Sequence, residues 1–234
     1  MELVTYIDSL WILIAGILVM FMQPGFMLVE TGFTRSKNSV NIVMKNFMDF
    51  SVGALTYWAF GFAFAYGGST LGGFIAYGNF FLEGDSSTYF FQVVFAATAA
   101  TIVSGSVAER TKFTSYLLFQ PFICGLIYPI VTHWVWSGQG WLTDLGFVDF
   151  AGSGVVHMVG GFAALAGVQI VGPRIGKYDD EGNPQAIPGS SMVAGALGVF
   201  ILWFGWYGFN VGSALAAVDV NLAAIAVTTT LSAA

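Results

Sequence analysis

Two polar side chains that could carry chemistry stand close together in an otherwise apolar part of the sequence. Asp149 comes directly before an apolar run, and His157 follows about two helical turns later, inside that run. A carboxylate at the start of a helix accepts hydrogen bonds from free backbone N–H groups. A neutral imidazole donates or accepts a hydrogen bond and costs less to bury than a fixed charge. His157 is therefore either a functional group at membrane depth or a packing histidine bonded to a neighbouring helix.

Aromatic residues form a second candidate group. Trp134 and Trp136 end an apolar run beside His133. Tryptophan at such a place is either an interfacial anchor or a cation–π platform for a small ammonium-like cation at a pore mouth. Phe91 and Phe95 are one helical turn apart and share a face. They either plug a narrow pore or simply pack against a neighbour.

The run from Trp206 to Ser213 is the third candidate group. Gly208 and Gly212 form a GxxxG pattern, which favours close contact between helices. Phe209 and Ser213 are four residues apart, so an aromatic ring and a hydroxyl could line one vestibule. The alternative is a tight helix crossing with a capping hydroxyl. The sequence contains no Walker loop, nucleophile elbow or metal-ligand pair at helical spacing, so we expect no enzyme, catalytic residue, metal or cofactor.

A membrane is needed to position these groups. Of 234 residues, 56% are hydrophobic and 9% are charged, whereas a soluble domain usually carries about 25% charged residues. Seven Lys and Arg residues are too few for nucleic-acid binding. A membrane helix needs about 20 mostly apolar residues, and the lack of strict alternation disfavours a barrel. We predict a seventh helix beginning near residue 220 and six complete membrane helices at 9–33, 43–67, 88–108, 113–136, 152–173 and 190–213.

The basic residues predict the orientation of these helices. The second, fourth and sixth connections contain no Lys or Arg. By the positive-inside rule, the odd-numbered connections are cytoplasmic and the N-terminus lies outside. The basic residues in or flanking the odd-numbered connections are Arg35, Lys37, Lys45, Arg110, Lys112, Arg174 and Lys177.

The end of the sequence predicts a truncated chain. A helix from about residue 220 to Ala234 would cover only about 22 Å at about 1.5 Å per residue. The hydrocarbon core of a bilayer is about 30 Å thick, and a terminal carboxylate inside it is costly. We therefore expect these residues to be part of a longer protein.

Several motifs, in the right order, resemble those of the Amt/Mep/Rh family of ammonium transporters. The run from Asp149 to His157, continued by Gly160 and Gly161, resembles the family signature. The similarity covers essentially the whole chain. Other segments that fit are Met22–Phe26, Glu30–Gly32, Arg35–Asn38, Asn41–Phe50, Ala108–Arg110, Gly172–Arg174 and Gly205–Ser213.

The resemblance implies an all-α integral membrane protein. The family fold has eleven helices per subunit, formed by two inverted repeats of five helices, and assembles as a trimer with one pore in each subunit. Residues 1–234 would then be one incomplete ammonium transporter domain. Its first repeat would cover about 9–173, and the start of the second about 190–234.

The resemblance also implies roles for single residues at the outer side. Trp136 and Ser213 resemble the site that recruits ammonium, with Phe95 as a third wall. Phe95 and Phe209 resemble the stacked pair that gates the vestibule, and Phe91 neighbours this gate.

Deeper in the membrane, His157 resembles the first of two paired pore histidines, and Trp206 another pore-wall aromatic. Asp149 resembles the buried carboxylate near the recruitment site. The second pore histidine belongs to the tenth helix of the family, which this sequence lacks.

The function implied by the resemblance is transport of ammonium or ammonia. Ammonium would lose its proton near the gate, and neutral ammonia would cross a dry pore. The implied partners are the lipid bilayer, two further copies in a homotrimer, and a PII-type regulator at the cytoplasmic face of the full-length protein. The alternative is an ammonium sensor with the same outer site, fused to a C-terminal signalling domain.

Overall fold

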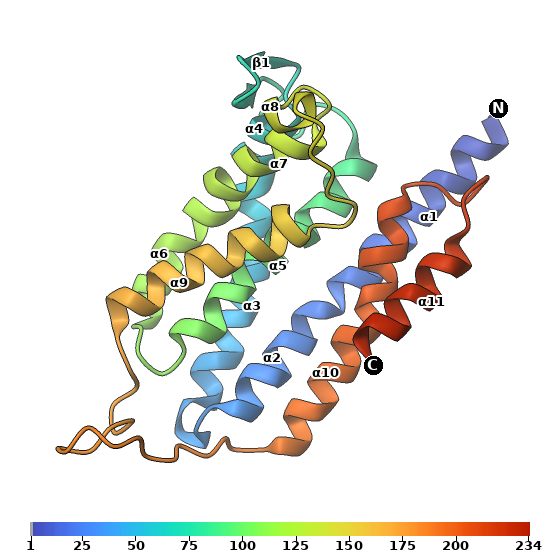
Figure 1. Ribbon diagram of the computed structural model, residues 1–234. Coiled ribbons are helices and arrows are strands. Elements are labelled where there is room, and N and C mark those ends of the chain that lie inside the picture. Colours follow the sequence, from blue (N-terminus) through green and yellow to red (C-terminus); the bar gives the residue numbers. More distant parts are fainter. Residues whose placement is uncertain (1) are drawn as a thin grey trace.

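The computed structural model describes residues 2–234 as a bundle of long helices with one small hairpin (Figure 1). α2 lies alongside α10, and α5 packs against both α3 and α9. The all-α membrane architecture predicted from the sequence is confirmed. The helices are α1 (Glu2–Met20), α2 (Met22–Phe33), η1 (Ser36–Asn38), α3 (Ser39–Thr56), η2 (Tyr57–Gly61), α4 (Phe62–Tyr66), α5 (Ser86–Val107), α6 (Phe113–Phe122), η3 (Ile123–Ile127), α7 (Tyr128–Trp136), α8 (Trp141–Asp144), η4 (Ser153–Met158), α9 (Val159–Val171), α10 (Met192–Trp206), η5 (Tyr207–Val211), η6 (Gly212–Ala214) and α11 (Leu222–Ala233).

The first predicted span is broken in its middle. α1 and α2 meet at a turn at Phe21. Pro24 explains the break, because proline has no N–H to donate and its ring clashes with the carbonyl four residues earlier, that of Met20. Helix resumes at once, so residues 2–33 still form one apolar membrane-spanning run.

The second predicted span differs most from expectation. It is helical from Ser39 to Tyr66 through α3, η2 and α4. Lys45, expected to flank the first connection, instead lies inside α3 and is 1% exposed. That expectation was wrong because a positional rule for basic residues takes no account of polar groups on neighbouring helices. Asn46 and Asp49 further lower the hydropathy of this span.

Five helical runs of the described chain are long and apolar enough to cross a membrane. They correspond to five of the six predicted spans, and the run 39–66 is the sixth. The predicted seventh helix is α11, which is shorter. The five runs are 2–33, 86–107, 113–144, 153–171 and 192–214.

A β-hairpin that the sequence did not predict lies in the second connection. β1 (Ser69–Leu71) pairs antiparallel with β2 (Ile75–Tyr77). Gly72 and Gly73 form the turn with φ of 57° and 75°, values that glycine adopts without strain.

His133 fastens this hairpin to the bundle. The ring is 1% exposed, with Nδ1 2.9 Å from the carbonyl oxygen of Ala65 and Nε2 2.8 Å from Oγ1 of Thr70. The carbonyl only accepts, so Nδ1 carries the proton and Nε2 accepts from the threonine. His133 is therefore a structural residue at the outer end of α7.

The structure confirms the close helix contact that the GxxxG pattern predicts. A Cβ at Gly208 would lie 2.5 Å from the carbonyl oxygen of Ala15, and one at Gly212 would lie 2.5 Å from the Ala15 side chain. α1 is thus pressed against η5, and this contact sets the position of the residues between the two glycines.

Four membrane helices of the described chain contain a π-helical turn. These turns are η2, η3, η4 and η5. π-helical turns are uncommon and occur frequently at functional sites. Here η4 contains His157 and η5 contains Phe209, so two of the candidate residues stand on such turns.

The first, third and fifth connections meet at Glu109. Its carboxylate accepts hydrogen bonds from Arg35 Nε at 2.8 Å, Asn38 Nδ2 at 2.7 Å and Arg174 Nη1 at 2.7 Å. Desolvation raises the pKa of Glu109, but the hydrogen bonds from Arg35, Arg174 and Asn38 outweigh it and lower the pKa to about 2. The three connections that contain the basic residues therefore lie at the same end of the bundle, as alternate connections between membrane helices must.

Candidate functional site

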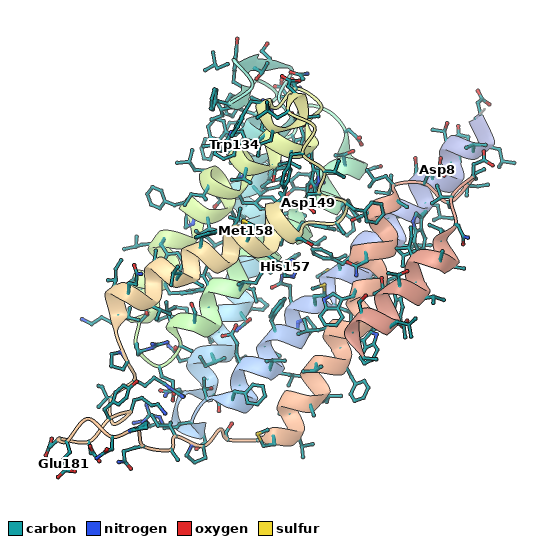
Figure 2. The ribbon with its side chains drawn as sticks, viewed as in Figure 1. Asp8, Trp134, Asp149, His157, Met158 and Glu181 are labelled. Atoms are coloured by element: carbon teal, nitrogen blue, oxygen red, sulfur yellow. The ribbon has the colours of Figure 1, made fainter. Side chains whose placement is uncertain are left out.

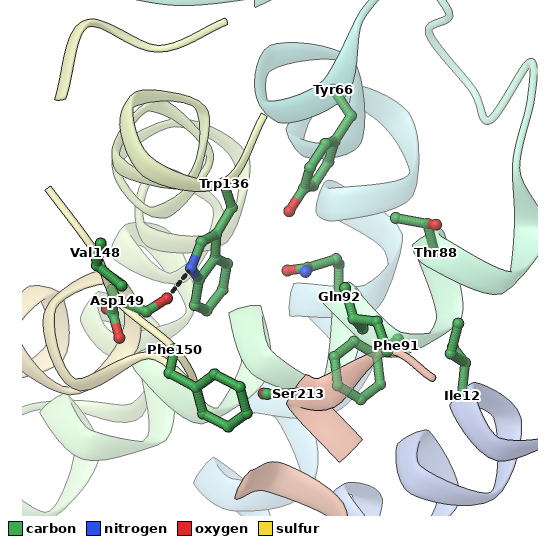
Figure 3. A pocket seen from close by; sticks show the side chains of 11 residues that line it. Ile12, Tyr66, Thr88, Phe91, Gln92, Trp136, Val148, Asp149, Phe150 and Ser213 are labelled. Atoms are coloured by element: carbon green, nitrogen blue, oxygen red, sulfur yellow. Dashed lines mark hydrogen bonds between the residues drawn. The ribbon is translucent and has the colours of Figure 1, made fainter. Parts of the chain in front are cut away.

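A cavity of about 440 Å³ opens at the other end of the bundle, between α1, α4, α5, α7 and the segments around residues 149 and 213 (Figure 3). Most of its walls are apolar or aromatic, and a few polar groups converge on it, as in typical ligand sites. The lining residues are Ile12, Tyr66, Thr88, Phe91, Gln92, Trp136, Val148, Asp149, Phe150, Ser213 and Leu215.

Trp136 forms one wall of this cavity. Its indole Nε1 donates a hydrogen bond of 2.7 Å to the backbone carbonyl of Asp149. This bond fixes the plane of the ring and uses its single donor. What Trp136 presents to a ligand is therefore π surface, which attracts cations. Figure 3 shows Trp136, Tyr66 and Gln92 pointing into the same space.

Ser213 contributes a hydroxyl that is already committed as a donor. Its Oγ donates to the backbone carbonyl of Phe209 at 2.7 Å. The hydroxyl has one hydrogen, so the lone pairs of Oγ remain as acceptors toward the cavity. A ligand rich in N–H donors suits this oxygen better than an anion does.

Stacked phenylalanine rings lie beneath the cavity. The ring centroids of Phe95 and Phe209 are 4.2 Å apart with an interplanar angle of 23°, and those of Phe91 and Phe95 are 4.6 Å apart. The ring centroids of Phe95 and Trp136 are 6.1 Å apart in an edge-to-face arrangement. Phe95 and Phe209 are 0% and 2% exposed, so the rings form an apolar plug.

His157 packs against the ring of Phe209. Its ring centroid is 5.4 Å from that of Phe209, at an angle of 75°. Nδ1 is 3.3 Å from the carbonyl oxygen of Gly152, which only accepts, so Nδ1 carries the proton and Nε2 remains an acceptor. In Figure 2 the exposed imidazole faces the space between η4 and the helices of the first and sixth spans. Its hydrogen bond is to its own segment and not to a neighbouring helix.

Comparison with known proteins identifies the family. A profile of the Ammonium Transporter Family matches residues 10–234. The chain belongs to this family. It is 50% identical to the ammonium transporter Amt2 of Archaeoglobus fulgidus over 244 residues, which cover 97% of this chain and 52% of that protein. It is 44% identical to ammonium transporter 3 of Dictyostelium discoideum over 214 residues, which cover 90% of this chain and 49% of that protein.

Solved structures of the family give the same result. A protein described as a sensor Amt protein superposes with a TM-score of 0.95 and 41% identity, over 99% of this chain and 60% of that chain. Mep2 of Candida albicans superposes with a TM-score of 0.81 and 30% identity, over 91% of this chain and 49% of that chain. This member of the ammonium transporter family is a multi-pass membrane protein. The chain spans about half the length of the curated relatives it matches.

Asp149 caps the fifth helix of this family member, as the sequence predicted. Oδ1 accepts from the backbone N–H groups of Gly152 at 2.8 Å and Ser153 at 3.0 Å. Oδ2 accepts from those of Gly154 and Val155, both at 2.8 Å. The carboxylate is half-buried, and the same residue holds Trp136 through its carbonyl. Asp149 therefore fixes the start of η4 relative to the cavity wall.

The cavity contains residues that the sequence analysis did not single out. Tyr66 and Gln92 both line it, and the Tyr128 hydroxyl donates to Gln92 Oε1 at 3.1 Å. An amide within an apolar run, next to Phe91, was the available signal for Gln92. Trp206 is half-buried and packs against the hydrophobic core. Among the described residues, it does not line the cavity.

Proposed function

We propose that the protein carries ammonium or ammonia across the membrane through a pore that begins at this outer cavity. One observation carries the proposal: a cavity with an aromatic face and a hydroxyl oxygen lies directly above a plug of stacked phenylalanines. Family membership and the names of the relatives support ammonium as the substrate.

Recruitment depends on Trp136 and Ser213. An ammonium ion has four N–H donors and a positive charge. The face of Trp136 attracts the charge, which contributes about 0.5–2 kcal/mol, and the Ser213 oxygen accepts one N–H. Phe95 closes the inner side of the site, where its ring meets both Trp136 and Phe209.

Deprotonation occurs at the Phe95–Phe209 gate. Passing a bare cation through stacked apolar rings costs tens of kcal/mol in an idealised apolar medium. Neutral ammonia costs far less, so ammonium transfers its proton to water in the outer cavity, which gives hydronium, and ammonia passes. His157, in contact with Phe209, is the first polar side chain beyond the gate in this proposal, and its Nε2 accepts an N–H from the passing molecule. Phe91 supports the gate, and Trp206 completes the wall of the pore.

The assembled protein is proposed to follow its family. Residues of about 9–173 form the first of two inverted repeats, and about 190–234 begin the second. Each subunit of a homotrimer in the lipid bilayer contains one pore, and a PII-type regulator binds at the cytoplasmic face.

A sensor of ammonium is the second candidate function. The observation that favours it is the TM-score of 0.95 with a chain described as a sensor Amt protein. A sensor would bind ammonium at the same outer cavity without moving it. Ammonium binding without measurable uptake by the full-length protein would support this candidate over transport.

Substitution of Trp136 by leucine tests the proposal. In the full-length protein, we expect W136L to raise the ammonium concentration for half-maximal uptake roughly 2- to 30-fold, which corresponds to the loss of about 0.5–2 kcal/mol of cation–π attraction. Trp134→Leu is the matched control, because Trp134 ends the same helix but donates to the Phe74 carbonyl, outside the cavity. Equal uptake by wild type and W136L at limiting ammonium would mean that Trp136 is only an interfacial anchor and does not recruit ammonium.

A further inference from the structure

A second group of polar residues lies inside the bundle, apart from the aromatic cavity. Glu30 of α2 is 7% exposed, and Lys45 and Asp49 of α3 are 1% and 0% exposed. The two ion pairs among residues 2–234 both belong to Glu109. Lys45 is therefore not in direct contact with either carboxyl group. Ionisable groups buried at membrane depth are costly and mark functional sites by default.

The two carboxyl groups have unequal surroundings. Asp49 accepts from the Tyr116 hydroxyl at 2.5 Å. Its second oxygen lies 3.2 Å from Thr101 Oγ1, whose single hydrogen is shared with Gln23 Oε1 at 3.0 Å. Glu30 Oε2 accepts from Ser104 Oγ at 2.8 Å, whereas its buried Oε1 has no hydrogen-bond partner. A buried polar atom without a partner calls for an explanation, and a proton carried on this oxygen supplies one.

The amino group of Lys45 is held by α5 and α6. Its Nζ donates to the backbone carbonyl of Ser104 at 3.1 Å and lies 4.7 Å from the centre of the Tyr116 ring. Both contacts favour the charged ammonium form, because a carbonyl accepts and an aromatic face attracts a cation.

A charge count shows that the cluster needs one further proton. Two carboxylates and one ammonium would leave one uncompensated negative charge, and a buried carboxylate in that position takes up a proton instead. The other titratable neighbours do not change the count. Tyr116 and Cys124 are neutral at physiological pH, and Arg110 is half-buried at the cytoplasmic end, where water screens its charge.

A route to the cytoplasm runs past Gly105. This glycine lines a cleft of about 280 Å³ at the cytoplasmic end, together with Thr34, Arg110 and Arg174. A Cβ at Gly105 would lie 3.9 Å from Glu30 Oε1. Gly105 therefore lines the cleft and lies next to the Glu30 carboxyl group, with no side chain of its own at this place.

We propose that Glu30, Lys45 and Asp49 form a proton-binding site that holds one exchangeable proton on its two carboxyl groups and exchanges it with the cytoplasm past Gly105. Uptake transfers a proton from hydronium in the cleft to a carboxylate oxygen, which leaves water and a neutral carboxyl group, and release is the reverse. The site is separate from the outer cavity and from His157, so it stands whether the protein transports or senses ammonium.

Infrared spectroscopy of the purified full-length protein tests the site. We expect the wild type to show the carbonyl stretching band of a protonated carboxyl group, shifted in heavy water. Glu30→Gln and Asp49→Asn should each lose the band and still fold, because Lys45 then faces one counter-charge. Asp85→Asn is the matched control and should keep the band, since Asp85 is an exposed helix cap. A wild-type spectrum without the band, or a band that survives in both variants, would overturn the proposal.

Two further variants test the charge count and the route. The double variant E30Q/D49N leaves Lys45 without a counter-charge and should fail to assemble, and adding Lys45→Met should restore assembly. Gly105→Ala should keep the band but slow its shift in heavy water. A double variant as stable as the wild type would refute the charge count, and an unchanged exchange rate in G105A would refute the route.

Discussion

Replacement of Asp149 by asparagine is the sharpest test of how the site is positioned. The carboxylate accepts four backbone N–H groups at 2.8–3.0 Å. Asparagine has nearly the same shape, but its amide oxygen serves only two of these donors. Its NH2 group faces the other two, which lose their acceptor.

The expected cost follows from the number of bonds lost. A hydrogen bond to a charged group contributes about 1.5–3 kcal/mol. Losing two of them destabilises the start of η4 by about 3–6 kcal/mol, a large part of the stability of a typical domain. The change also disturbs the cavity, because the Asp149 carbonyl holds Trp136 and because His157 lies in η4, about two helical turns after Asp149.

Thermal unfolding in detergent and ammonium uptake measure the two effects. We expect D149N to unfold at a clearly lower temperature than the wild type and to transport ammonium more slowly. Asp144→Asn is the control, because Asp144 is exposed at the end of α8. If D149N unfolded like the wild type, the carboxylate would not be the cap that holds η4 in place, and the reasoning would be wrong.

Three further predictions concern other parts of the molecule. The pKa of Glu109 is lowered from 4.5 to about 2, so this group should stabilise the fold above about pH 4.5 and lose that effect as the pH falls toward 2. Glu109→Gln should cost about 2–3 kcal/mol at neutral pH, seen in denaturant unfolding, and remove this acid dependence. His157→Leu should impair transport and His157→Asp or His157→Glu should alter ion selectivity in current measurements, whereas normal transport by H157L would exclude a pore role. Lys177→Cys should react with an impermeant thiol reagent only from the cytoplasmic side, and labelling of intact cells would reverse the predicted orientation.

Much of the fold could be predicted from local pattern. Long apolar runs located the membrane helices, and the spacing of Phe91 and Phe95, or of Gly208 and Gly212, correctly placed each pair on one face. Asp149 was recognisable as a cap because its acceptors and the free N–H groups are neighbours in sequence. The cap and the two residue pairs depend only on residues within two helical turns.

The remaining features depend on contacts between distant segments. Lys45 was expected near a helix end, but its carbonyl acceptor at Ser104 lies on another helix. Gln92 and Tyr66 face one cavity although they come from different spans. The periodicity of a single sequence contains no information on which side chains of different helices lie together. A hydropathy plot treats each membrane span as though only lipid surrounded it.

The π-helical turns bear on how the pore of this family could evolve. Such a turn uses one residue more than an α-helical turn. Deleting one residue within Tyr207–Val211 would return η5 to α-helical geometry. Because the π-helical turn accommodates its extra residue locally, the helix on both sides of the turn would keep nearly the same faces. α10 would stay packed on α2, and Ser213 would still face the cavity. A single-codon deletion or insertion at this turn is thus a route to changing the residues around Phe209 while the packing on both sides stays intact.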